Sequence, residues 1–262
     1  SYDNMNNTDP RVLAEWSNAE RAKRRVAPFP WTTGLKLVMA EVFGLHSFRP
    51  LQEEIINAVM AKKDVFVLLP TGGGKSLCYQ LPALLPSPLE VTIVFSPLIS
   101  LIQDQIVALN MATIPAMALT GQTTEEEKRS LMQEWYDGGE SVRHTLVYVT
   151  PEYFGRSDNF VTKLQRLNQH RQLGRFVIDE THCLSQWGHD FRPDYRKLSM
   201  LKQLFPNVPI SALTATATDR VQQDVINTLR LQSPVMFRGS FNRENLKYTV
   251  KQTTKKDLAE DV

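Results

Sequence analysis

The chain has 262 residues, and its 30 Lys and Arg side chains against 28 Asp and Glu give a formal net charge of +2. Hydrophobic residues make up 42% and charged residues 22% of the sequence, which excludes disordered and collagen-like chains. The near-neutral balance excludes a histone-like polycation but not a local basic patch. No apolar run approaches the roughly 18 residues of a membrane span. Two cysteines are too few for a disulfide framework or a four-thiolate zinc site, so we expect an intracellular, reducing compartment.

The first 30 residues predict an N-terminal arm. Residues 1–10 are polar without periodicity, a basic cluster lies between Arg21 and Arg25, and Pro28 and Pro30 then interrupt regular structure. A solvated linker accounts for the basic cluster more simply than a nucleic-acid contact does. We therefore place the start of the folded domain at Trp31.

The remaining chain alternates between helical and strand-like patterns. Apolar residues with helical spacing predict helices over 35–42 and 51–60, with Pro50 suited to the first turn of the second. Short apolar runs predict strands at 65–69, 91–95, 115–119, 145–149, 175–178 and 208–213. Amphipathic stretches between them predict helices at 98–109, 123–135, 160–173 and 218–229. Thr123 and Glu126 would form a capping box at the start of the second of these four helices.

This alternation predicts an α/β domain with a mostly parallel sheet and helices on both of its faces. Crossover connections between parallel strands are right-handed. Ligands of such sheets bind at the carboxyl ends of the strands. The polar motifs that directly follow the predicted strands are therefore the candidate functional residues.

A glycine-rich loop follows the first predicted strand. Gly72, Gly73 and Gly74 allow close backbone approach to a ligand, and Lys75 and Ser76 open the next helix. In a P-loop, the backbone N–H groups hold phosphates, the lysine reaches the β- and γ-phosphates, and the hydroxyl binds magnesium. Leu69 stands where the motif has its first glycine. A flexible turn without a ligand is the alternative, which the strand–loop–helix context disfavours.

An acidic pair follows the strand predicted at 175–178. Asp179 would lie at the strand end, where a P-loop fold holds its second magnesium-associated acid. Glu180 could orient or deprotonate an attacking water. His182 could link the nucleotide to the rest of the domain, although a buried structural histidine is the alternative. An Asp-Glu pair alone occurs by chance, and the preceding P-loop is what makes this pair informative.

The segment from Ser185 to Tyr195 is rich in aromatic side chains. Trp187, Phe191 and Tyr195 could stack on unpaired bases, and Arg192 could meet phosphate. A buried hydrophobic turn is the alternative, but the polar, Gly- and Pro-containing composition disfavours it. We expect a loop that senses single-stranded nucleic acid and reports to the ATP site.

Two further strand ends carry hydroxyl groups. Ser96 and Thr150 could hold backbone phosphates without reading sequence, or they could be ordinary helix caps. Between residues 156 and 175 five basic side chains oppose only Asp158. A solvated helix face explains this surplus more simply than nucleic-acid binding does. Its members are Arg156, Lys163, Arg166, Arg171 and Arg175.

The motifs together resemble those of superfamily 2 helicases, and more narrowly those of RecQ-family DNA helicases of the Bloom-syndrome type. The resemblance covers about residues 28–250. Its motifs are FGLHSFRPLQ (43–52), LPTGGGKSLCYQLPAL (69–84), SPLISLIQDQ (96–105), YVTPE (148–152), DETHCLSQWGHDFRPDY (179–195), LTATAT (213–218) and SFNRENL (240–246).

The resemblance implies a RecA-like P-loop NTPase domain and an ATP site. Gln52 would read the adenine base, with a helix-surface amide as the alternative, and Arg49 would support the base or the phosphates. Asp179 and Ser76 would hold Mg²⁺, the former through water, and Glu180 would act as general base. The implied ATP-binding residues are Arg49, Gln52, Thr71, Gly72, Gly73, Gly74, Lys75 and Ser76. The implied catalytic residues are Lys75, Asp179 and Glu180.

The resemblance also implies how DNA and nucleotide are coupled. Thr214 and Thr216 would transmit nucleotide state to domain movement, with strand and turn packing as the alternative. The implied coupling residues are His182, Gln186, Thr214 and Thr216. The implied DNA-binding residues are Trp187, Phe191, Arg192, Ser96 and Thr150.

Two residues depart from the family pattern. Thr181 replaces the usual alanine, which we expect to be a functional variant, and Glu244 replaces a typical proline. The expected organisation is an arm over 1–30, a RecA-like ATP-binding domain over 31–240 and, over 241–262, the start of a linker to a second RecA-like domain. The second domain would supply the arginine finger, and the zinc module and winged helix of the family are missing, so we expect no zinc.

The predicted function is that of a motor lobe of a 3′-to-5′ DNA helicase acting in repair and recombination in the nucleus, with ATP and Mg²⁺ as cofactors and single-stranded and branched DNA as partners. An RNA-dependent DEAD/DEAH-type ATPase and a nucleic-acid clamp without turnover are the alternatives. The aromatic loop disfavours the first, and intact Lys75, Asp179 and Glu180 disfavour the second. A small-molecule P-loop kinase is a third alternative, which is disfavoured because the sequence shows no evident lid for an acceptor substrate.

Overall fold

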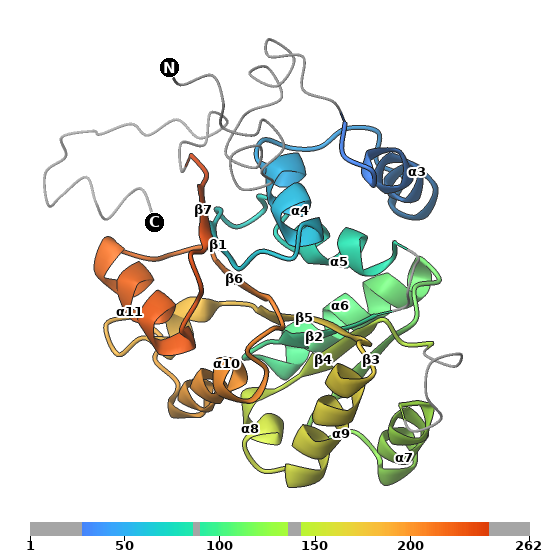
Figure 1. The fold of residues 1–262 in the computed structure, drawn as a ribbon, viewed down its shortest axis with the longest axis vertical. Coiled ribbons are helices and arrows are strands. Elements are labelled where there is room, and N and C mark those ends of the chain that lie inside the picture. Colours follow the sequence, from blue (N-terminus) through green and yellow to red (C-terminus); the bar gives the residue numbers. More distant parts are fainter. Residues whose placement is uncertain (1–27, 86–89, 136–142, 241–262) are drawn as a thin grey trace, which may run out of the picture.

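The computed structural model describes residues 28–85, 90–135 and 143–240. Seven parallel strands form one sheet in the order β3-β4-β2-β5-β6-β1-β7 (Figure 1). The strands are β1 (Val65–Leu68), β2 (Val91–Phe95), β3 (Ala116–Leu119), β4 (Leu146–Val149), β5 (Leu173–Ile178), β6 (Ile210–Thr214) and β7 (Val235–Arg238). The predicted parallel α/β sheet is confirmed, and β6 separates the P-loop strand β1 from the acidic strand β5.

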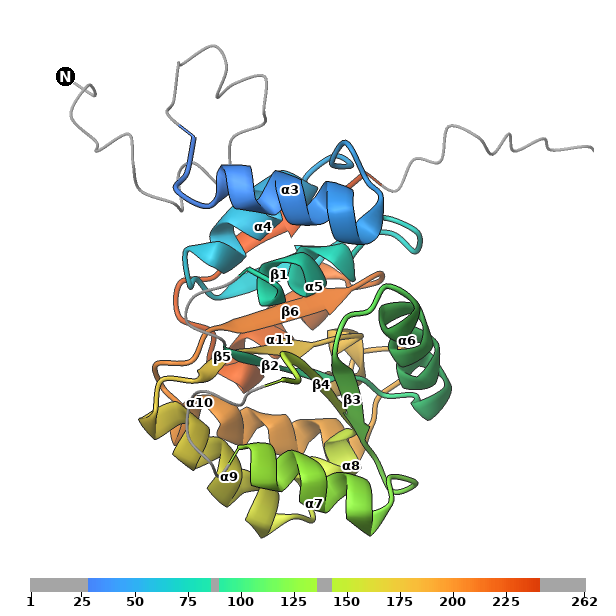
Figure 2. The ribbon, with the colours of Figure 1, turned by 90° about the vertical axis from the view of Figure 1, so that its right-hand side faces the viewer.

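Two groups of helices cover the two faces of this sheet (Figure 2). One face packs against α3 (Thr32–Phe43), α4 (Gln52–Met60), α5 (Leu77–Ala83) and α6 (Ile99–Met111). The other packs against α7 (Glu125–Glu134), α8 (Pro151–Phe154), α9 (Asp158–Gln169), α10 (Leu201–Leu204), α11 (Asp219–Leu229) and the 3₁₀ segments η1 (Thr181–Leu184) and η2 (Pro193–Met200). Strand side chains alternate between the two cores, as Phe66 and Val67 of β1 do.

The seventh strand, β7, was not expected from the sequence. Val235 and Phe237 are buried whereas Met236 and Arg238 are exposed, so this edge strand carries too little apolar character to form a continuous run. It pairs with β1 and completes the sheet on the P-loop side.

Three local predictions placed a feature one or a few residues from where the structure has it. The capping box lies one residue later than predicted, because Thr124 and Glu127 exchange the two hydrogen bonds, while Thr123 accepts one from the Thr120 N–H. Pro50 precedes the first turn of α4, since Leu51 is the N-cap residue. The helix predicted over 160–173 ends at Gln169, because the backbone turns left-handed at Arg171, with φ 58°. Strand β5 begins at Leu173, which pairs with Val91 ahead of a register shift.

A buried ion pair holds the amino ends of the strands. Lys202 Nζ lies 2.9 Å from Asp64 Oδ1, and both side chains are buried. The Asp64 carboxylate also accepts hydrogen bonds from the backbone N–H groups of Ile210 and Gln232. One carboxylate thus fixes the starts of β1 and β6 and the approach to β7. Within the described ranges, no helix is both long enough and apolar enough to cross a membrane.

Candidate nucleotide-binding and coupling site

The glycine-rich loop lies at the carboxyl end of β1. Gly72 and Gly74 have φ values of 79° and 78°, which side-chain-bearing residues rarely adopt. A side chain at Gly73 would meet the carbonyl oxygen of Pro70 at 2.9 Å. Thr71 is exposed, and Ser76 is the N-cap residue of α5, although its side chain makes no capping hydrogen bond. The loop therefore has the backbone and helix-end geometry that a bound phosphate group needs.

Lys75 lies between the P-loop strand and the acidic strand end. Its Nζ donates a hydrogen bond of 3.3 Å to the carbonyl oxygen of Leu69, the residue at the position of the missing glycine. The positive charge of Lys75 also acts on Asp179 and Glu180, where it favours the ionised form of each carboxyl group. The structure thus brings together the three predicted catalytic residues from β1 and β5.

The pKa values of the two acidic side chains are shifted in opposite directions. Burial, followed by the neighbouring charge of Glu180, raises the pKa of Asp179 to about 6. Burial acts on Glu180 in the same direction, but the hydrogen bond from His182 and the charges of Lys75 and His182 outweigh it and lower its pKa. Glu180 is therefore ionised at neutral pH and can accept a proton, whereas Asp179 carries a poorly stabilised negative charge that a cation would stabilise.

Arg49 and Gln52 bind the P-loop itself in this structure. The Gln52 amide is 3% exposed; its Nε2 donates to the carbonyl oxygen of Gly74 at 3.1 Å, and its Oε1 accepts from the Arg49 N–H at 2.7 Å. The Arg49 guanidinium donates to the carbonyl oxygen of Gly72. Adenine recognition by Gln52 stays a prediction, and it requires the amide to exchange these partners. The alternative of a surface amide does not fit a buried side chain.

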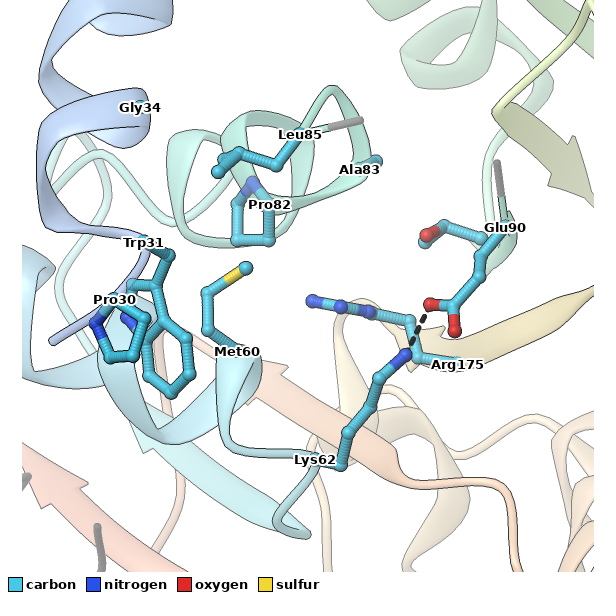
Figure 3. A pocket seen from close by; sticks show the side chains of 11 residues that line it. Pro30, Trp31, Gly34, Met60, Lys62, Pro82, Ala83, Leu85, Glu90 and Arg175 are labelled. Atoms are coloured by element: carbon cyan, nitrogen blue, oxygen red, sulfur yellow. Dashed lines mark hydrogen bonds and ion pairs between the residues drawn. The ribbon is translucent and has the colours of Figure 1, made fainter. Parts of the chain in front are cut away.

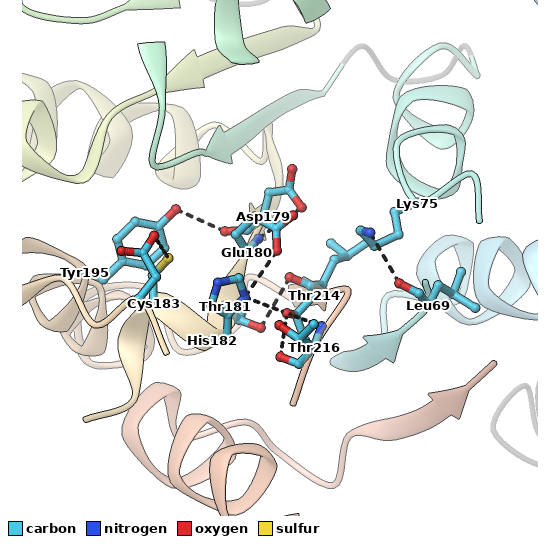
Figure 4. A network of polar contacts seen from close by, with 12 residues as sticks. Leu69, Lys75, Asp179, Glu180, Thr181, His182, Cys183, Tyr195, Thr214 and Thr216 are labelled. Atoms are coloured by element: carbon cyan, nitrogen blue, oxygen red, sulfur yellow. Dashed lines mark hydrogen bonds and ion pairs between the residues drawn. The ribbon is translucent and has the colours of Figure 1, made fainter. Parts of the chain in front are cut away.

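A chain of polar contacts links β5 to β6 (Figure 4). His182 Nδ1 lies 2.8 Å from Thr214 Oγ1 and 3.2 Å from Glu180 Oε2. Thr214 Oγ1 in turn donates to the carbonyl oxygen of exposed Thr216 and accepts from its N–H. Glu180 itself has a left-handed backbone, with φ 48°, which residues other than glycine adopt uncommonly.

Two buried hydroxyl groups support this strand end. Thr181 Oγ1 donates to the carbonyl oxygen of Leu213 at 3.3 Å, so the residue that departs from the family pattern has a hydrogen-bond partner on β6. Tyr195 Oη donates to the carbonyl oxygen of Asp179 at 3.0 Å. The sequence suggested Tyr195 as a base-stacking side chain, and this was wrong, because Tyr195 is fully buried.

The rest of the aromatic loop lies at the surface. Trp187 is 58% exposed, and the guanidinium carbon of Arg220, on α11, lies 3.3 Å from its ring centroid. Gln186 is exposed, and Phe191 is half-buried. Gly188 packs against the carbonyl oxygen of His182, where no side chain would fit. The loop is therefore partly exposed, and it packs directly on the residue that joins Glu180 to Thr214.

Arg192 binds the protein as well as facing solvent. Its Nη1 donates to the carbonyl oxygen of Pro97 at 2.8 Å, and its Nη2 lies 3.0 Å from Asp190 Oδ2. The Asp190 carboxylate also accepts from the Cys183 thiol. These contacts connect the loop to the segment after β2, a connection that its motif letters do not reveal.

Ser96 and Thr150 are both buried. The Thr150 hydroxyl accepts from the Tyr153 N–H and caps α8, as the alternative interpretation predicted. The Ser96 hydroxyl has no hydrogen-bond partner. Contact of either hydroxyl with DNA stays a prediction and requires movement of the surrounding chain.

Sequence reasoning missed Arg220, and it noted His189 within the aromatic loop without giving it a role. Arg220 follows the TATAT motif by two residues, which is the only signal that could have suggested it. The His189 ring stacks on that of His182 with centroids 4.4 Å apart.

Glu244 and the basic cluster at 21–25 lie outside the described residues. The group His182, Cys183 and Asp190 brings potential metal-ligand atoms within 4.8 Å of one another, so the absence of zinc stays a prediction.

Fold and site together define a P-loop nucleotide-binding domain, and comparisons with known proteins agree. The DEAD/DEAH box helicase family matches residues 49–225. ATP-dependent DNA helicase Q-like 4B of Arabidopsis thaliana is 54% identical over 234 residues, 89% of this chain and 20% of that protein. RecQ-like DNA helicase BLM of Xenopus laevis is 45% identical over 254 residues, 97% of this chain and 18% of that protein.

Solved structures share the fold. DUF1998 helicase MrfA bound to DNA aligns with a TM-score of 0.59 and 18% identity over 80% of this chain and 30% of that one. The Hef helicase domain of Pyrococcus furiosus aligns with a TM-score of 0.53 and 20% identity over 78% of this chain and 39% of that one. The RecA-like helicase fold is confirmed.

The chain belongs to the DEAD/DEAH box helicase family. The relatives named above are RecQ helicases, which confirms the resemblance in the motifs, and the chain spans about a fifth of their length.

Proposed function

We propose that this chain is the first motor lobe of a RecQ-type DNA helicase, which hydrolyses ATP to move 3′-to-5′ along single-stranded DNA and unwind duplexes. The observation that supports this most strongly is the convergence of Lys75, Asp179 and Glu180 from β1 and β5, with their charges acting on one another. Family membership implies use of ATP with a divalent metal ion, which we propose to be Mg²⁺.

The residues at the site fit such a metal. The raised pKa of Asp179 marks a carboxylate whose negative charge is poorly stabilised by the protein alone. Asp179 and the Ser76 hydroxyl would hold Mg²⁺, which stabilises phosphate charge when bound. Lys75 would neutralise the β- and γ-phosphates. Glu180, ionised and held by His182, would take the proton of the attacking water.

The DNA side of the proposal depends on the aromatic loop. Exposed Trp187 offers a face on which an unpaired base can stack regardless of sequence. Movement of the loop would reach Glu180 through His189 and His182. We propose further that residues 241–262 lead to a second RecA-like domain that supplies an arginine finger, and that the enzyme acts on branched DNA in the nucleus.

An RNA-dependent ATPase is the second candidate, because DEAD/DEAH membership alone does not separate RNA from DNA. The DNA helicases among the relatives favour DNA. The deciding experiment measures ATP hydrolysis by the longer protein with both motor domains, in the presence of single-stranded DNA or RNA of one sequence. Stronger stimulation by DNA, with unwinding of 3′-tailed but not 5′-tailed duplexes, supports the proposal. Stronger stimulation by RNA would replace it with the second candidate.

A further inference from the structure

A cavity lies away from the P-loop, at the amino ends of the central strands. Its volume is about 510 Å³, and α3, α4, α5, β2 and β5 surround it (Figure 3). Apolar side chains form much of its wall, among them Trp31, Met60, Pro82 and Leu85. The charged side chains at the cavity are Lys62, Glu90 and Arg175.

Arg175 occupies a core-facing position of β5. Its partner across the sheet is Thr92, and Val177, two residues further along β5, is buried under α3–α6. Side chains two residues apart lie on the same face of a strand. The basic surplus predicted as a solvated helix face was therefore wrong for Arg175, which replaces an apolar side chain in the interior.

The Arg175 guanidinium has unsatisfied donors. The residue is 4% exposed, and its Nε and Nη1 have no hydrogen-bond partner. Burial lowers the pKa of Arg175 to about 10, so the group remains charged at neutral pH. Buried charged donors are normally paired, because leaving them unpaired costs free energy. In Figure 3 the guanidinium extends from β5 into the cavity below Pro82 and toward Met60.

The neighbouring charges do not fully compensate the positive charge of Arg175. Lys62 Nζ binds the Glu90 carboxylate, and a second, longer contact of 3.5 Å joins Lys62 to the carbonyl oxygen of Gly174. Glu90 therefore faces two cations, Lys62 and Arg175, and its charge favours the ionised form of both. The cavity has a surplus of one positive charge, located on the buried guanidinium.

We propose that this cavity binds a small organic carboxylate with an aromatic or aliphatic body. The carboxylate would accept from the unpaired donors of Arg175 once the guanidinium turns toward the cavity, because Nε and Nη1 are both buried in this structure. A planar guanidinium matches a carboxylate in shape and charge. The body would pack on Trp31, Met60 and Leu85. A single negative charge balances the surplus, and the volume lies within the range of small-molecule sites. This inference is independent of the proposed helicase function.

The test uses benzoate as the probe and benzamide as its uncharged counterpart. Each is titrated into this chain at constant ionic strength, and binding is followed by calorimetry and by the shift of the thermal midpoint. We expect benzoate to bind and raise the midpoint with concentration, and benzamide to bind at least tenfold more weakly. Equal binding of the two compounds, or no binding of benzoate, would overturn the proposal.

Three variants locate the site. Arg175→Met should abolish benzoate binding and melt no lower than the parent, because it replaces a buried charged group that has two unpaired donors with an apolar side chain. Glu90→Gln, at the rim, should tighten benzoate binding severalfold by removing the competing carboxylate. Lys36→Met removes one positive charge from the exposed surface of α3 and should leave benzoate affinity unchanged.

The variants also define how the proposal fails. If Arg175→Met keeps the benzoate affinity of the parent, the probe binds elsewhere. If Lys36→Met loses as much benzoate affinity as Arg175→Met does, the effect comes from net charge and not from this site. If Arg175→Met does not fold, Glu90→Gln decides alone: unchanged or weaker benzoate binding contradicts the site, and tighter binding supports it.

Discussion

The imidazole rings of His182 and His189 stack with centroids 4.4 Å apart and planes 16° from parallel. His182 also contacts Glu180 and Thr214. The aromatic loop therefore touches, through His189, the residue that joins the candidate general base to β6. The side chains of His189 and His182 thus provide a physical route by which DNA binding at the loop would act on ATP hydrolysis at Glu180.

The His189 contact predicts a loss of coupling. In the longer protein with both motor domains, His189→Ala should retain its DNA-free ATPase rate and lose most of its stimulation by single-stranded DNA, because the loop loses its packing on His182. His170→Ala, at an exposed position after α9, is the matched control. Full stimulation in His189→Ala would exclude this stacking as the route.

Lys75→Ala should abolish ATP hydrolysis in the longer protein without unfolding it. Lys75 lies at a half-buried surface position, and its charge serves the site rather than the core. Loss of one such charge-stabilising group typically lowers turnover by about 10²- to 10³-fold. ATPase rate and thermal midpoint are measured together, with Lys36→Ala as control. Hydrolysis at the parental rate would remove the P-loop assignment.

Gln52→Ala should weaken ATP binding more than GTP binding. A Gln amide can donate and accept at once and so match the N6 and N7 edge of adenine, as it does in DNA recognition. Because Gln52 also binds the carbonyl oxygen of Gly74, some loss of affinity for both nucleotides is expected. Equal losses, measured by equilibrium titration, would assign Gln52 to holding the P-loop only.

The raised pKa of Asp179 predicts a pH dependence of stability. Between the unfolded pKa near 3.8 and the folded pKa of about 6, the folded state binds more protons, so the contribution of Asp179 to stability falls as pH rises through this window. Asp179→Asn should raise the free energy of unfolding at pH 7 by about 1–2 kcal/mol and flatten its pH profile. Asp104→Asn, on the exposed side of α6, should do neither. A parental pH profile in Asp179→Asn would contradict the raised pKa.

The sequence predicted those parts of the site that short-range patterns determine. Strand, loop and helix are contiguous around Lys75, and a buried run ends at Asp179, so both positions followed from apolar patterning. The parallel sheet then brings such strand ends to one edge.

Other features depend on contacts between distant residues. Asp64 and Lys202 are far apart in the sequence and pair only because the sheet order brings them together. Tyr195 and Arg175 were expected at the surface from their sequence neighbours, yet both are buried by packing that composition does not reveal. The contact between Arg220 and Trp187 likewise joins two separate motifs.

The central claim is that the loop around Trp187 couples DNA binding to hydrolysis, and the most direct test is the ATPase rate of Trp187→Ala with and without single-stranded DNA. The guanidinium of Arg220 covers Trp187 in this structure, so a stacking base must displace it or use the opposite ring face. We predict a parental rate without DNA and loss of most of the stimulation at saturating DNA. Full stimulation and full unwinding by Trp187→Ala would contradict the account.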